Sequence, residues 1–102
     1  MADLNLGDRI TLAPDVLIQE LAGESVLLNL NSEEYFGLDD VGTRMITVLN
    51  ESDSVAIAQA QLLQEYEVES EQLSQDLLDL IRNLQTHGLI TITPAPLDGS
   101  TA

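Results

Sequence analysis

The chain has 102 residues, enough for one domain around one core. Its hydrophobic content of 44% is typical of a folded protein, whereas three arginines against 18 Asp and Glu residues give a net charge of −15. Nucleic acids and anionic membranes attract basic surfaces, so neither is expected as a partner. The sequence contains no cysteine, which excludes disulfides, thiol catalysis and zinc–thiolate sites. The N-terminus lacks the basic start and apolar run of a signal peptide, and a cytoplasmic location is expected.

The first half of the sequence predicts strands separated by turns. Residues 9–12 and 16–21 are short apolar or β-branched stretches on either side of Ala13-Pro14-Asp15, which is typical of a turn. Residues 25–30 have the composition of a half-buried strand, and residues 34–38 form a further short strand. We interpret these stretches as an antiparallel meander with short connections.

The second half predicts three helices. Asp39 or Asp40 can cap the first helix, Ser54 the second, and Ser70 begins the third, which ends at Gly88 with a glycine cap. The predicted inward faces, at spacings of three and four residues, are Val41, Met45, Ile46 and Leu49; then Val55, Ala58, Leu62 and Tyr66; and then Leu73, Leu77, Leu80 and Leu84.

The expected fold class is α+β, a winged helix-turn-helix in which a three-stranded antiparallel sheet is followed by three helices. Residues 89–93 can add a short terminal strand, and the composition turns to Pro, Gly, Ser and Thr from Pro94 onward. We therefore expect a flexible N-terminus over residues 1–8, one domain over residues 9–93, and a flexible tail over residues 94–102. This fold hosts more functions than DNA binding, so it does not decide the function.

No pattern in the sequence predicts a catalytic or metal centre, and no cofactor is expected. The single histidine, His87, lies in the last turn of the third helix, where an imidazole interacts favourably with the helix dipole. Asp53-Ser54-Val55 is similar to the Asp-Ser-Leu of acyl carrier proteins, whose serine carries phosphopantetheine. Ordinary helix capping by Ser54 explains the same residues, and the strand-rich first half disagrees with an all-helical carrier.

Residues 25–49 resemble the PqqD-like family, the domains that recognise leader peptides of ribosomally made, post-translationally modified peptides. The shared pattern is a strand with aromatic-x-Leu-Asp, here Phe36 to Asp39, that runs into a helix with the small-residue start Val41-Gly42-Thr43. The resemblance extends over about residues 9 to 92 and is greatest to the free-standing members from lasso-peptide pathways. It implies a non-catalytic adaptor that presents the leader to a cysteine peptidase and then to a cyclase. An acidic assembly or inhibitor protein on the same fold is the alternative.

The resemblance also implies that the leader adds as a strand beside residues 34–38, with its side chains facing the third helix. The residues expected to bind it are Glu34, Tyr35, Phe36, Gly37, Leu38, Ser74, Leu77, Leu78, Ile81 and Gln85. Phe36 and Leu38 are assigned mainly to the core. Leu78 and Ile81, with Ser74 and Gln85, lie to one side of the leucine stripe, and either a partly open groove or a broader contact with the second helix explains them.

Overall fold

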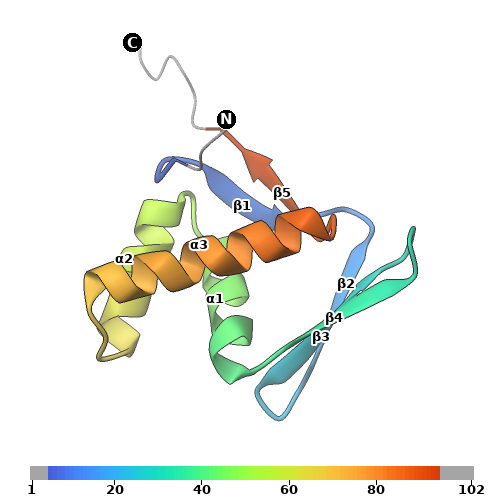
Figure 1. Cartoon of the computed structure of the whole chain (residues 1–102), viewed down its shortest axis with the longest axis horizontal. Helices are drawn as coiled ribbons and strands as arrows, with labels where there is room; N and C mark the ends of the chain where they lie inside the picture. Colours follow the sequence, from blue (N-terminus) through green and yellow to red (C-terminus); the bar gives the residue numbers. More distant parts are fainter. Residues whose placement is uncertain (1–4, 95–102) are drawn as a thin grey trace.

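The computed structural model describes residues 5–94, and the expectations for residues 1–4 and 95–102 lie outside the described residues. Figure 1 shows one sheet that projects from the body of helices, with a separate strand pair beside the helices. The elements in chain order are β1 (Arg9–Leu12), β2 (Val16–Leu21), β3 (Glu24–Asn29), β4 (Glu34–Leu38), α1 (Asp40–Glu51), α2 (Val55–Glu65), α3 (Ser70–Thr86) and β5 (Ile90–Thr93). The predicted α+β arrangement, three antiparallel strands followed by three helices, is confirmed.

The three-stranded sheet has the order β2-β3-β4, with both pairs antiparallel. Leu27 in the central strand lies opposite Ile18 of β2 and Phe36 of β4, so the three side chains share one face. Leu27 is fully buried on that face, and the Oγ of Ser25 forms a buried 2.7 Å hydrogen bond with the Oγ1 of Thr43 in α1. The inner face of the sheet is thereby fixed against the first helix.

The ends of the helices agree with the sequence. Asp39 caps α1 by accepting a hydrogen bond from the Gly42 amide, and Ser54 caps α2 by accepting one from the Ile57 amide. Gly88 follows α3 with a φ of +69°, a conformation that favours glycine. The Gly88 and Leu89 amides donate to the Gln85 and Leu84 carbonyls, the pattern of a Schellman cap.

The core lies between the inner face of the sheet and the three helices. Most of the predicted inward residues are buried, but Val41 is 38% exposed, and Tyr66 and Leu80 are only partly buried. Val41 lies in the first turn of α1, where the helix has just left β4. The fully buried large side chains are Ile10, Leu27, Ile46, Val48, Leu49, Leu62, Leu77, Ile81, Leu84 and Leu89.

Two features of the fold go beyond the sequence expectation. Strand β1 pairs with β5 in a separate two-stranded sheet, with Arg9 opposite Thr93, and does not join the meander. Residues 5–8, expected to belong to a flexible N-terminus, contact the start of α2, since the Leu6 and Asp8 carbonyls accept hydrogen bonds from the Ala56 and Val55 amides. The helices within residues 5–94 lack the length and hydrophobicity of a membrane span.

Candidate functional site

Strand β4 is an edge of the three-stranded sheet. Within residues 5–94 it pairs only with β3, from Ser25 opposite Leu38 to Asn29 opposite Glu34, so its other side carries backbone N–H and C=O groups that are not bonded to a further described strand. Glu34, Tyr35 and Gly37 are exposed, Phe36 is partly buried and Leu38 is buried. An edge of this kind can accept an extended peptide as an additional strand.

A groove of about 540 Å³ runs along this free edge, between β4, the start of α1 and one side of α3. We call it the β4–α3 groove, and its lining residues are Phe36, Gly37, Leu38, Asp39, Val41, Gly42, Met45, Asp76, Leu80 and Asn83. Gly42 allows α1 to begin close to the strand, because a Cβ at this position would lie 3.2 Å from the Cδ2 of Leu38. The groove combines an apolar floor with an adjacent strand edge, which is what β-strand addition with side-chain selectivity requires.

The opposite edge of the sheet, β2, has less space beside it. The hollow there, which Ile18, Ile46 and Thr47 help to line, measures about 190 Å³. Since both edges can supply backbone hydrogen bonds, the larger pocket for side chains favours β4 as the peptide-binding edge.

Leu80, Asp76 and Asn83 are the residues of α3 that line the β4–α3 groove. They recur at three- and four-residue steps, so they occupy one side of the helix. The next position on this side is His87, whose ring lies 5.2 Å from that of Phe36, measured between centroids, and whose Nδ1 lies 2.8 Å from the Asn83 carbonyl oxygen. His87 therefore lies beside β4 at the C-terminal end of α3, where its contacts are with residues of the fold.

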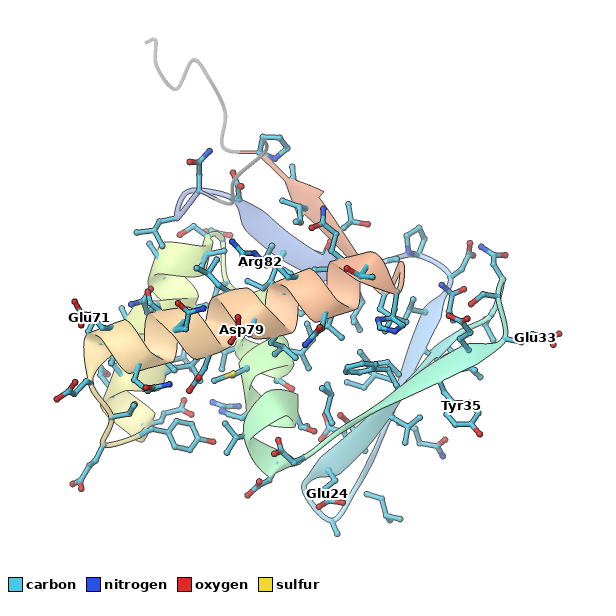
Figure 2. The ribbon with its side chains drawn as sticks, in the orientation of Figure 1. Glu24, Glu33, Tyr35, Glu71, Asp79 and Arg82 are labelled. Carbon is cyan, nitrogen blue, oxygen red and sulfur yellow. The ribbon has the colours of Figure 1, made fainter. Side chains whose placement is uncertain are left out.

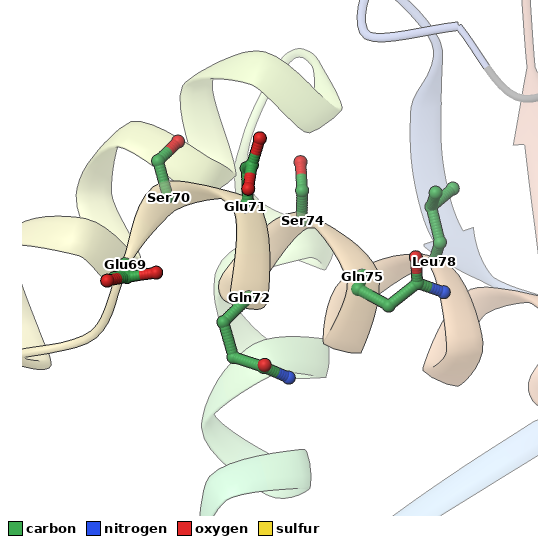
Figure 3. Close-up of a pocket in the computed structure, with 7 residues that line it drawn as sticks. All are labelled: Glu69, Ser70, Glu71, Gln72, Ser74, Gln75 and Leu78. Atoms are coloured by element: carbon green, nitrogen blue, oxygen red, sulfur yellow. The ribbon is translucent and has the colours of Figure 1, made fainter.

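The sequence placed a possible groove on the Leu78 and Ile81 side of α3, whereas the β4–α3 groove is lined by Asp76, Leu80 and Asn83. Ile81 is 1% exposed and Leu77 is also 1% exposed, so both are core residues. Leu78 and Ser74 project from the same side of the helix (Figure 3) and line a hollow with Leu6, Val55 and Gln59, and the Ser74 hydroxyl donates to the Gln59 Oε1. That side faces α2 and the segment at residues 5–8, and not β4.

The sequence expectation and the β4–α3 groove differ because the width of the apolar stripe does not show which side of α3 faces β4. Leu78 and Ile81 widen the apolar stripe toward α2, whereas the opposite side carries polar Asp76 and Asn83 beside Leu80. The usable signal was the spacing of Asp76, Leu80, Asn83 and His87, which share the side of the helix facing the strand. Gln85 is exposed and lies on the Leu78 side by helical spacing.

The charged groups of the groove lining are carboxylates. Asp39 is engaged as the cap of α1, and Asp76 accepts a 2.9 Å hydrogen bond from the Gln72 side chain. The closest ion pair in residues 5–94 joins Arg44 of α1 to Glu65 of α2 through hydrogen bonds of 2.8 and 2.7 Å. These hydrogen bonds, with a further one from Gln61, lower the pKa of Glu65 to about 2. The pair fixes α2 against α1 and lies outside the groove lining.

No group of metal-ligating side chains gathers within residues 5–94.

Comparisons with known proteins identify the family and two similar structures. The family model described as coenzyme PQQ synthesis protein D (PqqD) matches residues 24–90, a span that contains β3, β4, all three helices and the complete groove. No curated protein matches.

Two solved structures are similar to the chain. One is TbiB1 in complex with the TbiA(beta) leader peptide, with a TM-score of 0.74 and 31% identity over 78% of this chain and 93% of that chain. The other is a lasso peptide synthetase B1 complexed with its leader peptide, with a TM-score of 0.73 and 28% identity over 81% of this chain and 98% of that chain. The family match covers more than half of the sequence, and the chain belongs to the PqqD family.

Proposed function

We propose that this protein is a non-catalytic adaptor that binds the leader of a ribosomally made precursor peptide as an added antiparallel strand on β4. The observation that carries the proposal is the free edge of β4 beside the apolar β4–α3 groove. Backbone groups of β4 supply hydrogen bonds to any extended peptide, and the groove selects among peptides through alternate side chains.

The similar solved structures support the choice of ligand. Both are proteins held in complex with a leader peptide, and each aligns over nine-tenths or more of its own length with this chain. The leader is therefore the class of peptide that we assign to the groove. Among the groove residues, Phe36, Leu80 and Met45 supply apolar contact, and the backbone of Gly37 lies open beside them.

We further assign the protein to lasso-peptide biosynthesis, in which it delivers the leader first to a cysteine peptidase and then to a cyclase. The likeness to a lasso peptide synthetase B1 supports this pathway. A cytoplasmic site of action fits a precursor made on ribosomes. No cofactor enters this role, because strand addition needs only backbone and side-chain contacts.

The direct test is a titration of the purified protein against a fluorescein-labelled leader, followed by fluorescence anisotropy. We expect a dissociation constant from micromolar to nanomolar, about −8 to −12 kcal/mol, and an unchanged peptide mass after prolonged incubation. A precursor cleaved by the pure protein alone would contradict the adaptor role. So would a failure to bind any leader from the same biosynthetic pathway.

A further inference from the structure

Both charged side chains that line the β4–α3 groove are acidic. Asp39 lies where β4 leads into α1, and Asp76 lies on α3, so the two carboxylates belong to different walls of the groove. Both residues are exposed. The Gly42 amide donates to the Oδ1 of Asp39, and the Gln72 side chain donates to the Oδ1 of Asp76. An ionised carboxylate accepts several hydrogen bonds through its two oxygens, so each group can also bind a donor from a ligand.

The cations of the chain lie elsewhere, and all three are arginines. Arg44 is paired with Glu65, and Arg9 lies 3.7 Å from Asp53. Arg82 belongs to α3 but lies on the side of this helix that is turned away from β4 (Figure 2). Within residues 5–94, no basic side chain therefore lines the groove beside its carboxylates, and the net charge of −15 adds to the negative potential there.

The two carboxylates lie toward one end of the groove. Strand β4 passes the C-terminal end of α3 first, where the rings of Phe36 and His87 are 5.2 Å apart. Asp39 follows the last residue of β4, and Asp76 precedes His87 by about three helical turns. A leader strand antiparallel to β4 runs in the opposite direction, so its N-terminal residues would lie at the end of β4 that leads into Asp39.

We propose that the β4–α3 groove selects leaders that carry a lysine or arginine at the N-terminal end of the added strand, and that Asp76, together with Asp39, determines this choice. The inference rests on the proposed function, which places the leader in this groove. The apolar stem of a lysine or arginine can lie along Leu80, one turn from Asp76, while its charged head reaches the carboxylate. A leader with an acidic residue at this place is repelled, so the same two groups also reject unsuitable leaders.

The charge of the groove also affects the rate of binding. A groove lined by one sign of charge raises the local concentration of a ligand of opposite charge, and with it the association rate. Charges are screened over about 8 Å at physiological salt, so carboxylates elsewhere on the surface contribute little to the attraction. The salt dependence of leader binding should therefore depend mainly on the two groove residues, which distinguishes them from the general acidity of the chain.

The test compares two double variants that change the net charge equally. Asp39→Asn/Asp76→Asn removes both groove charges and keeps their hydrogen bonds, because the Oδ1 of asparagine also accepts and asparagine caps a helix as well as aspartate does. Glu67→Gln/Glu69→Gln is the matched control, since both residues are exposed, lie between α2 and α3 and do not line the groove. Fluorescence anisotropy is measured at low and at high salt with the labelled leader, and with a second leader in which glutamine replaces the lysines and arginines of the N-terminal segment.

We expect the wild type to bind the leader more tightly at low salt than at high salt. At low salt, Asp39→Asn/Asp76→Asn should raise the dissociation constant about fivefold, the upper range for an exposed charge pair. The control should stay within about twofold of the wild type, and the glutamine leader should lose affinity for the wild type but not for the groove variant.

Salt-independent binding by the wild type, or equal losses in the two double variants, would overturn the proposal. It would also be overturned by a leader that binds tightly along β4 and has no basic residue in its N-terminal segment. Absence of leader binding by the wild type at either salt concentration would instead refute the proposed function, and the charge selection with it.

Discussion

A carboxylate on one side of α3 should weaken leader binding, whereas the same change on the other side should leave the affinity nearly unchanged. Leu80 lines the β4–α3 groove and is partly buried, while Leu78 lines the hollow toward α2. We therefore compare Leu80→Asp with Leu78→Asp, two identical substitutions two residues apart. Both positions already face solvent in part, so each variant should stay folded, with a lower melting temperature than the wild type.

The size of the effect follows from burial. Complete burial of a leucine side chain contributes about 1.5–3 kcal/mol, and a leader would cover only the exposed remainder of Leu80, worth at most about 1 kcal/mol. A carboxylate beneath the bound peptide adds a desolvation penalty. Together, the lost apolar contact and the desolvation penalty should reduce the binding free energy of the leader by about 2 kcal/mol or more, which is a loss of about thirty-fold in affinity.

Fluorescence anisotropy with the labelled leader measures this difference, after thermal melts have shown that both variants fold. Leu80→Asp should raise the dissociation constant, and Leu78→Asp should leave it within about twofold of the wild type. The reverse result, tight binding by Leu80→Asp and loss by Leu78→Asp, would place the groove on the α2 side and refute the reasoning.

Three further predictions concern stability. Leu77→Asp and Ile81→Asp should both unfold the domain or lower its melting temperature severely, because each buries an unpaired charge at a position that is 1% exposed. A small fall in melting temperature for Ile81→Asp would contradict its place in the core. Ser54→Ala should lower the free energy of unfolding by about 1 kcal/mol through loss of the α2 cap. The wild type should gain no mass when it is incubated with coenzyme A and a phosphopantetheinyl transferase. A mass gain that Ser54→Ala abolishes would support an acyl carrier role. The lowered pKa of Glu65 makes its pairing with Arg44 stabilising above pH 4.5 and progressively lost toward about pH 2. The melting temperatures of the wild type and Glu65→Gln should therefore converge on acidification, with Glu67→Gln as control, and a constant gap would show that the carboxylate charge is not responsible.

Local signals in the sequence predicted the elements well. Caps at Asp39 and Ser54 and the glycine after α3 depend on interactions within a few residues, and the structure has all three. The edge position of β4 followed from the meander, since the last strand of a meander has one unpaired side.

Long-range contacts were harder to predict. The pairing of β1 with β5 joins residues about 80 positions apart, and no local sequence pattern predicts it. The side of α3 that faces β4 likewise depends on how the helix is rotated in the fold. Hydrophobicity pointed to Leu78 and Ile81, but Leu78 contacts the α2 side and Ile81 fills the core. The binding roles of the β4 residues 34–38, and of Ser74, Leu78 and Gln85, stay predictions.

The central claim is that the leader binds along β4, and amide hydrogen exchange of the protein with and without leader tests it most directly. We predict that exchange slows over residues 34–38, where the free amides of the edge gain partners, while residues 16–21 of the opposite edge β2 keep their rates. Protection of β2, or of the helix surface around Ser74 and Leu78, with β4 unchanged would contradict the account.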